Sequence, residues 1–352
     1  MADNEELQEE PWEERTLNLL HDSKIDQELS ASKSRKRGRK KHSMKWMKTP
    51  MAIPEVIVEL QDQELRETAL RCLSSFLVEK REEDPENYNR TGYFLYNSCG
   101  TMAILLQEVI MFYGKMTDGS LNVRSAKRLA NVLTLFQSIA ANPETRHNFV
   151  NSFMPNYLIP LILFETPLEI YEIVRAMALS VVGILCQARE SKIIQWAINN
   201  AMVEICRVSI QIGNELSKVI AMHILEAILQ DWSGISYVCS PTSDNLVKGL
   251  MQTWGRLVAY LAEDQDFSPR LLFHIMRCSF LLCQHRRGYN IVMDNLPVQI
   301  VDGSFQDMLE EFPVIRCLLD ELSLIVGKIE KCFPISSLHN ILDWKPIEPL
   351  CH

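Results

Sequence analysis

Apolar side chains recur three and four positions apart through most of the chain, from Pro54 to Lys331. This spacing places them on one face of an α-helix, and no segment shows the sustained alternation of a half-buried β-strand. The clearest faces lie within residues 60–76, 102–110 and 129–139. The pattern therefore predicts an all-α protein.

Short polar loops separate the predicted helices at similar intervals. They lie at residues 141–145, 188–191, 230–233 and 284–287. Asn142-Pro143 has the composition of a helix start, because Asn caps the free amide groups and Pro is favoured at the first helical position. The loops recur every 43 to 54 residues, roughly the period of armadillo and HEAT repeats. We therefore expect an armadillo-like superhelix over residues 54–331, with an extended surface for a partner chain.

Charge is divided unevenly along the chain. The formal net charge is −9, yet residues 1–30 hold ten acids and two bases, and residues 33–48 hold nine bases and no acid. Highly charged sequence without sustained apolar periodicity does not form a packed core. We expect a disordered arm at residues 1–53, first acidic and then basic, and a separate C-terminal tail at residues 332–352.

The basic run has two competing interpretations. An accessible cluster of Lys and Arg is typical of a nuclear import signal. The same cluster can also hold the phosphates of nucleic acid without sequence preference. A third alternative is that the run, which is common in proteins, does neither. The import interpretation predicts a protein of the nucleus and the cytoplasm and rests on Lys33, Arg35, Lys36, Arg37, Arg39, Lys40 and Lys41.

The sequence lacks the common catalytic and metal-binding motifs. It contains no HExxH, GxSxG, GxGxxG or GxxxxGK[ST]. Its ten cysteines form no CxxC pair, which indicates a reducing compartment without disulfides or a zinc site. His274 and Cys278 lie one helical turn apart, but an apolar helix favours packing over catalysis. We expect no enzyme, no cofactor and no metal, and the absence of 18 consecutive uncharged apolar residues predicts no membrane span.

Several segments resemble one protein family, in the same order along the chain. They read GTMAILLQEV at 100–109, NPETRHNF at 142–149, GNELSKVIAMHIL at 213–225 and RLLFHIMRC at 270–278. These segments are similar to the required-for-cell-differentiation family, the armadillo-repeat subunit of the CCR-NOT deadenylase complex. The resemblance runs from about residue 65 to residue 326.

The resemblance implies a non-catalytic adaptor that links mRNA turnover to regulatory partners. Its implied partners are the large scaffold subunit of the complex, peptides of mRNA-silencing proteins, nucleic acid in the groove and a second copy of the chain. A nuclear transcription regulator that uses the basic arm on nucleic acid is the alternative. An armadillo-type transport receptor is a weaker rival, because it normally has Trp-Asn pairs and the sequence contains none.

Two departures indicate a divergent member of the family. Residues 167–177 read PLEIYEIVRAM where the family has a segment close to RPFEYLRLTSLGVIGAL. After Cys239, the sequence SPTSDN at 240–245 replaces an aromatic and an arginine that the family usually has. Family members hold partner tryptophans in small pockets. We therefore expect binding of the scaffold to be retained and binding of tryptophan-rich peptides to be weaker. Trp196, Trp232 and Trp254 are expected to pack or to anchor loops.

A first group of candidate site residues is basic. Arg270, His274 and Arg277 share one helical face, and Arg286 and Arg287 follow at the next loop. Such a cluster can hold phosphate or an acidic peptide, and the resemblance places Arg270 and Arg287 in the basic groove of the family. The alternative is a solvated face with acidic partners in the same chain.

A second group lies on the helix after Asn214. It consists of Lys218, Val219, Ile220 and His223. The resemblance places Ile220 where family members receive partner peptides, which makes the group a candidate peptide-binding surface. The alternative is that these residues belong to the ordinary core of a repeat.

Overall fold

The computed structural model describes residues 53–263 and 268–327, and every regular element in these two ranges is helical. The apolar faces predicted from spacing are buried, as Leu129, Leu133 and Phe136 on one helix show, since each is at most 2% exposed. The all-α prediction is confirmed. The predicted arm and tail, residues 1–53 and 332–352, lie outside the described residues except for Ile53.

The helices form consecutive units of three, preceded by α3 (Ile53–Glu59) and α4 (Arg66–Glu83). In each unit, two helices of varying length lead into a third helix. The third helices pack against one another in the interior. The units are α5 (Pro85–Asn97), α6 (Thr101–Thr117) and α7 (Val123–Ala141); α8 (Pro143–Asn151), α9 (Ile159–Leu163) and α10 (Ile170–Gln187); α11 (Ser191–Asn199), α12 (Met202–Ile212) and α13 (Glu215–Gln230); α14 (Trp232–Val238), α15 (Asp244–Glu263) and α16 (Pro269–Cys283); and α17 (Arg286–Asn295), α18 (Gln306–Glu311) and α19 (Pro313–Val326). Short 3₁₀ helices, η3 (Met154–Leu158), η4 (Pro241–Ser243) and η5 (Val298–Ile300), join some of them.

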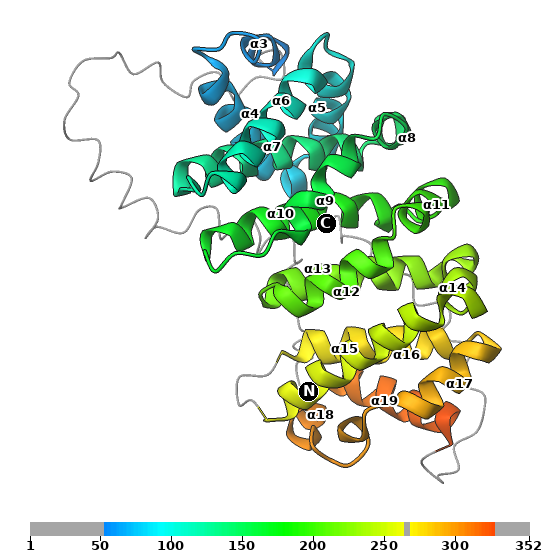
Figure 1. The fold of residues 1–352 in the computed structure, drawn as a ribbon. Helices are drawn as coiled ribbons and strands as arrows, with labels where there is room; N and C mark the ends of the chain where they lie inside the picture. Colours follow the sequence, from blue (N-terminus) through cyan, green and yellow to red (C-terminus); the bar gives the residue numbers. More distant parts are fainter. Residues whose placement is uncertain (1–52, 264–267, 328–352) are drawn as a thin grey trace, which may run out of the picture.

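The third helices form the centre of the molecule. Along the stack, α7 packs against α10, α10 against α13, α13 against α16 and α16 against α19 (Figure 1). Helix α10 is long and apolar enough to cross a bilayer by length and composition, yet 78% of it is buried inside this stack. Its apolar character therefore reflects packing against neighbours on both sides.

The helix starts follow the capping chemistry read from the sequence. Asn142 accepts hydrogen bonds from the backbone amides of Glu144 and Thr145, at 2.8 and 3.2 Å, and Pro143 occupies the first position of α8. Asn214 accepts from the amide of Ser217 at 3.0 Å and caps α13. These caps satisfy amide groups that have no partner within the helix.

The first helix of a unit crosses the end of the preceding third helix at very short range. A Cβ atom added to Gly234 on α14 would lie 1.9 Å from the carbonyl oxygen of Ile228, and one added to Gly288 on α17 would lie 2.2 Å from that of Leu282. At the same six-residue offset, the Thr145 hydroxyl donates to the carbonyl oxygen of Ile139 at 2.7 Å. Each of these carbonyls lies in the last turn of its helix, so the crossing recurs along the stack.

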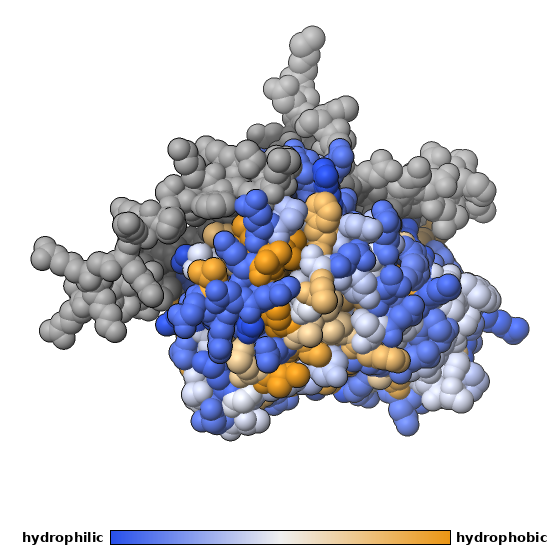
Figure 2. Space-filling model, turned by 90° about the horizontal axis from the view of Figure 1, so that it is seen from above, coloured by the Kyte–Doolittle hydropathy of each residue, from blue (hydrophilic) through white to orange (hydrophobic). Residues whose placement is uncertain are grey.

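The N-terminal end of the stack is partly apolar. Figure 2 views this end and shows a band of hydrophobic residues between hydrophilic ones. Ile110 and Met111 on α6 are 51% and 47% exposed, and Val58 on α3 is 63% exposed. This end therefore differs from the polar outer face that closes many repeat arrays.

Candidate functional site

A cluster of ionisable side chains joins two third helices in the C-terminal half of the stack. Glu226 on α13 lies between His274 and Arg277 on α16: its Oε2 is 3.0 Å from His274 Nδ1, and its Oε1 is 3.3 Å from Arg277 Nε. The three side chains are only 12–16% exposed. Two of the predicted basic residues are therefore bound to an acid of the same chain.

The Glu226 carboxylate remains charged because its partners outweigh its burial. Burial alone would raise its pKa. The hydrogen bond to His274 and the electrostatic interactions with His274, His223 and Arg277 instead hold the pKa at about 2. The cluster thus contains a fixed negative charge at neutral pH, and that charge neutralises the basic face predicted for this helix.

His223 is the second histidine of the cluster. Its ring centroid lies 6.0 Å from that of His274, and the two rings meet edge to face. Burial, followed by the electrostatic effect of the neighbouring His274, lowers the pKa of His223 to about 4, against an opposing effect of Glu226. His223 is therefore neutral at pH 7.

Acidification should weaken the fold through His223. Its pKa is about 4 in the folded chain and 6.5 in the reference state, so the unfolded chain takes up the proton first. The resulting stabilisation is complete above about pH 6.5 and is lost as the pH falls towards 4. From pH 7 to pH 5 we expect the free energy of unfolding to fall by about 2 kcal/mol more in the wild type than in His223→Phe. Urea unfolding of both proteins at the two pH values measures this difference, and parallel losses would contradict it.

The remaining basic candidates are spread over a wider surface. Arg287 forms an ion pair with Asp244 at the start of α15, and this contact links two consecutive units. Arg286 is exposed and Arg270 is half-buried. The predicted partnership with acids of the same chain thus holds for His274, Arg277 and Arg287. Any capacity to hold an acidic ligand rests on Arg270 and Arg286.

The second predicted group is largely internal, which corrects the peptide-contact interpretation for two of its members. Val219 is 4% exposed and Ile220 is 0% exposed. Helix α13 is covered by α10 on one side and by α16 on the other, so these side chains belong to the core. Lys218 and His223 are half-buried. The proposed peptide surface is therefore limited to these two positions.

Cys278 is also a core residue, as its apolar surroundings predicted. It is 0% exposed, and its Sγ lies 4.0 Å from the carbonyl oxygen of Met222. Burial raises the pKa of the Cys278 thiol well above its ordinary value. A protonated, inaccessible thiol is a poor nucleophile, so Cys278 and His274 do not form a reactive pair.

Residues 240–245, where the sequence indicates a departure from the family, form a small polar turn. Ser240 precedes η4, whose Pro241 and Thr242 are exposed, and Asp244 begins α15. The hydroxyl oxygens of Ser240 and Thr242 are 2.5 Å apart. No aromatic side chain occurs within residues 240–245, so this turn supplies no ring against which a partner indole could stack.

The tryptophans divide between the core and the surface. Trp196 and Trp254 are 7% and 0% exposed, as expected for packing residues, but Trp232 is 75% exposed. Its ring lies against that of His285, with ring centroids 6.4 Å apart. Trp232, the first residue of α14, therefore does not pack in the core, and of its two expected roles only the anchoring of a loop remains.

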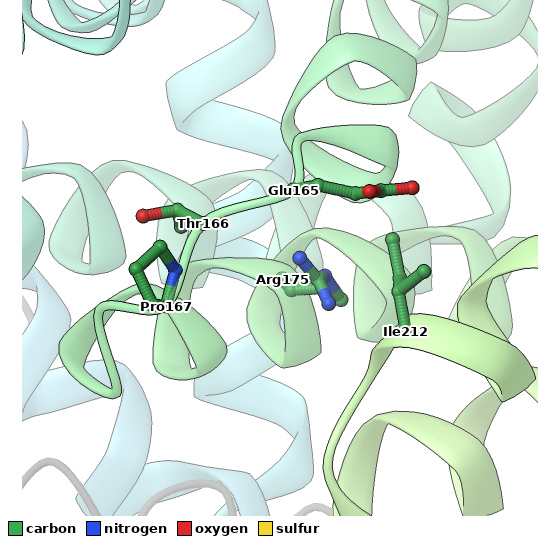
Figure 3. A pocket seen from close by; sticks show the side chains of 5 residues that line it. All are labelled: Glu165, Thr166, Pro167, Arg175 and Ile212. Carbon is green, nitrogen blue, oxygen red and sulfur yellow. The ribbon is translucent and has the colours of Figure 1, made fainter.

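A pocket that the sequence reasoning missed lies beside α10. Its volume is about 370 Å³, and it is lined by Glu165, Thr166, Pro167, Arg175 and Ile212 (Figure 3). Arg175 is 1% exposed, one of the largest fully buried side chains. The available signal was the pair Glu172 and Arg175, two charges one turn apart within an otherwise apolar helix.

The stacked three-helix units define an armadillo-like repeat protein. A designed armadillo repeat protein superimposes with a TM-score of 0.54 at 13% sequence identity and covers 78% of this chain and 99% of its own. A second designed armadillo repeat protein, solved in complex with the peptide (KR)4, gives a TM-score of 0.53 at 12% identity, with coverage of 78% and 99%. At such identities the likeness concerns the fold alone.

Within this class, the chain belongs to the Rcd1-like cell differentiation family, whose model matches residues 56–326. The cell differentiation protein rcd1 of Schizosaccharomyces pombe is 29% identical over 262 residues, which are 74% of this chain and 88% of the relative. Protein CAF40 of Saccharomyces cerevisiae is 28% identical over 239 residues, which are 66% of this chain and 62% of the relative. The family predicted from the sequence is confirmed.

Proposed function

We propose that this chain is a non-catalytic adaptor subunit of the CCR-NOT deadenylase complex, which links mRNA turnover or translational repression to regulatory partners. The observation that carries the proposal is the family match, which extends over nearly the whole described repeat array. Armadillo-like arrays offer long surfaces to partner chains. The burial of Cys278 and the neutralised Glu226 cluster also favour a binding role over a catalytic one.

The proposed partners are the large scaffold subunit of the complex and, with reduced affinity, tryptophan-rich peptides of silencing proteins. The polar turn at residues 240–245 supports the reduced affinity, because a missing aromatic or cationic partner weakens indole binding by about 0.5–2 kcal/mol. Nucleic-acid binding through Arg270 and Arg286, and self-association, remain parts of the proposal that rest on the family resemblance.

A second candidate function is nuclear transcription regulation through the basic run at residues 33–48. Its nine basic side chains favour it, although these residues lie outside those that the structure describes. We propose that the run directs part of the protein to the nucleus, so that the protein occurs in the nucleus and the cytoplasm.

One pair of tagged proteins tests both functions in cells. The wild-type chain should recover the scaffold subunit in a pull-down. A variant with Lys36, Arg37, Arg39 and Lys40 replaced by Ala should recover the same amount of scaffold but shift towards the cytoplasm. Loss of the scaffold from the wild-type pull-down, or recovery of chromatin alone, would contradict the adaptor function. An unchanged distribution of the variant would contradict the import signal.

A further inference from the structure

Arg175 lies at the base of the pocket beside α10 with hydrogen-bonding capacity to spare. Its Nη2 donates to the carbonyl oxygen of Phe164, and its Nη1 lies 2.9 Å from Glu172 Oε1. Within residues 53–263 and 268–327, neither Nε nor Nη1 has an acceptor in hydrogen-bonding geometry, although both atoms are buried. A guanidinium carries five N–H donors in a fixed planar arrangement. The side chain can therefore donate into the pocket that it lines.

The charge of Arg175 is already balanced within the chain. Glu172, 16% exposed, is its ionic partner. Glu172 is in turn held at the start of α13, where it accepts a hydrogen bond from the Asn214 amide at 2.8 Å and lies 3.4 Å from the Ser217 hydroxyl. Because this network fixes the carboxylate beside the guanidinium, the base of the pocket is polar without being strongly positive.

A further carboxylate lies at the rim. Glu165 is exposed, and Figure 3 shows its side chain extending past the Arg175 guanidinium on the side of Ile212, whereas Thr166 and Pro167 lie on the other side. An anionic ligand would approach both Glu165 and Glu172 and would be repelled. The pocket thus combines a buried donor, an exposed acceptor and the apolar surfaces of Pro167 and Ile212.

We propose that this pocket binds the carboxamide side chain of a glutamine or asparagine in a partner peptide. The amide oxygen accepts from Arg175, the amide nitrogen donates to Glu165, and the methylene stem lies between Pro167 and Ile212. The volume of about 370 Å³ is at the small end of the range for ligand sites and suits one side chain with its adjoining backbone. This peptide subsite deepens the adaptor function proposed above and rests on it.

The arrangement discriminates between side chains of nearly equal size. Glutamate replaces the amide donor with a second charged oxygen, which faces Glu165. Methionine fills the same length but leaves the Arg175 donor without an acceptor. Sites built to hydrogen-bond a ligand reject analogues that lack the matching group. We expect each analogue to bind about tenfold more weakly than glutamine.

Three blocked amino acids test this selectivity on the full-length chain. The probes are the N-acetyl, N-methylamide derivatives of glutamine, glutamate and methionine, titrated while the arginine Nε–H signals are followed by NMR. The glutamine probe should bind with a Kd on the order of 1 mM and shift the Arg175 signal, which is assigned from its loss in Arg175→Lys. Equal affinities for the three probes, or binding that leaves the Arg175 signal in place, would overturn the proposal.

A surface variant keeps the test independent of folding. Glu165→Lys replaces the rim acceptor with a cation, and it should weaken the glutamine probe about tenfold and make the glutamate probe the preferred one. Glu169→Lys is the matched control: Glu169 is also exposed, has the same charge and does not line the pocket. An unchanged preference in Glu165→Lys, or the same change in Glu169→Lys, would overturn the proposal.

The probes bind the isolated chain, whereas the adaptor function is tested by recovery of the scaffold in cells. Failure of the probes with normal scaffold recovery would overturn the subsite alone. Selective binding of the glutamine probe without scaffold recovery would retain a carboxamide site but reject its place in the adaptor.

Discussion

Glu226→Gln should lower the free energy of unfolding by about 3 kcal/mol. The carboxylate holds His274 and Arg277 together across the contact between α13 and α16, and all three side chains are mostly buried. Glutamine keeps the volume but leaves the Arg277 guanidinium without a compensating charge and His274 without its carboxylate partner. Urea unfolding at pH 7, followed by far-ultraviolet circular dichroism, measures the change.

An exposed ion pair supplies the control for this result. Glu204 and Arg207 lie three residues apart on α12, and the side chain of Glu204 is 44% exposed. Because solvent screens such a pair, Glu204→Gln should change the free energy of unfolding by less than about 1 kcal/mol. If the two substitutions were equally destabilising, burial would not distinguish the cluster from an ordinary surface pair.

Gly234→Ala should also destabilise the protein by about 3 kcal/mol. The added methyl group would lie 1.9 Å from the carbonyl oxygen of Ile228, so α14 would have to move away from the end of α13. The displaced atom is backbone and cannot rotate away as a flexible side chain would. Thermal and urea unfolding measure the loss.

Gly255→Ala is the matched control on α15. An added Cβ there meets no atom within 4 Å, and alanine is the better helix former, so the variant should gain about 0.5–1 kcal/mol. The pair of variants separates close packing from helix propensity. A stable Gly234→Ala protein would show that the crossing of α14 and α13 can relax.

The fold was accessible from the sequence because its signals are local. Apolar spacing of three and four positions identifies each helix, and Asn142 and Asn214 mark two of the helix starts through their own side chains. The recurring loops then indicated the repeat. None of these signals depends on knowing which helices meet in space.

The candidate site was less predictable because exposure depends on neighbouring units. Ile220 lies on a helix covered from both sides and is fully buried, whereas Trp232 begins its helix at the edge of a crossing and is exposed. Helical periodicity identifies one apolar face but cannot show that a second face is also covered. The partners of His274, Arg277 and Arg287 likewise come from other helices, 43 to 51 residues away in the sequence.

The pocket at Arg175 shows the same limit. Its walls come from the loop before α10 and from the last residue of α12. The sequence places a charged pair in an apolar helix, which suggests a buried ion pair. It does not specify the path of the loop that leaves space above the guanidinium.

The column of third helices gives the molecule the character of a one-dimensional chain of coupled elements. Each internal member is supported by the member before it and the member after it, so the stability of the whole is close to a sum of units and the interfaces between them. A substitution that weakens one interface destabilises the two units that share it most, and its effect decreases with distance along the array. Opening the array at α10 would therefore divide it into two blocks, each ending in a newly exposed apolar face.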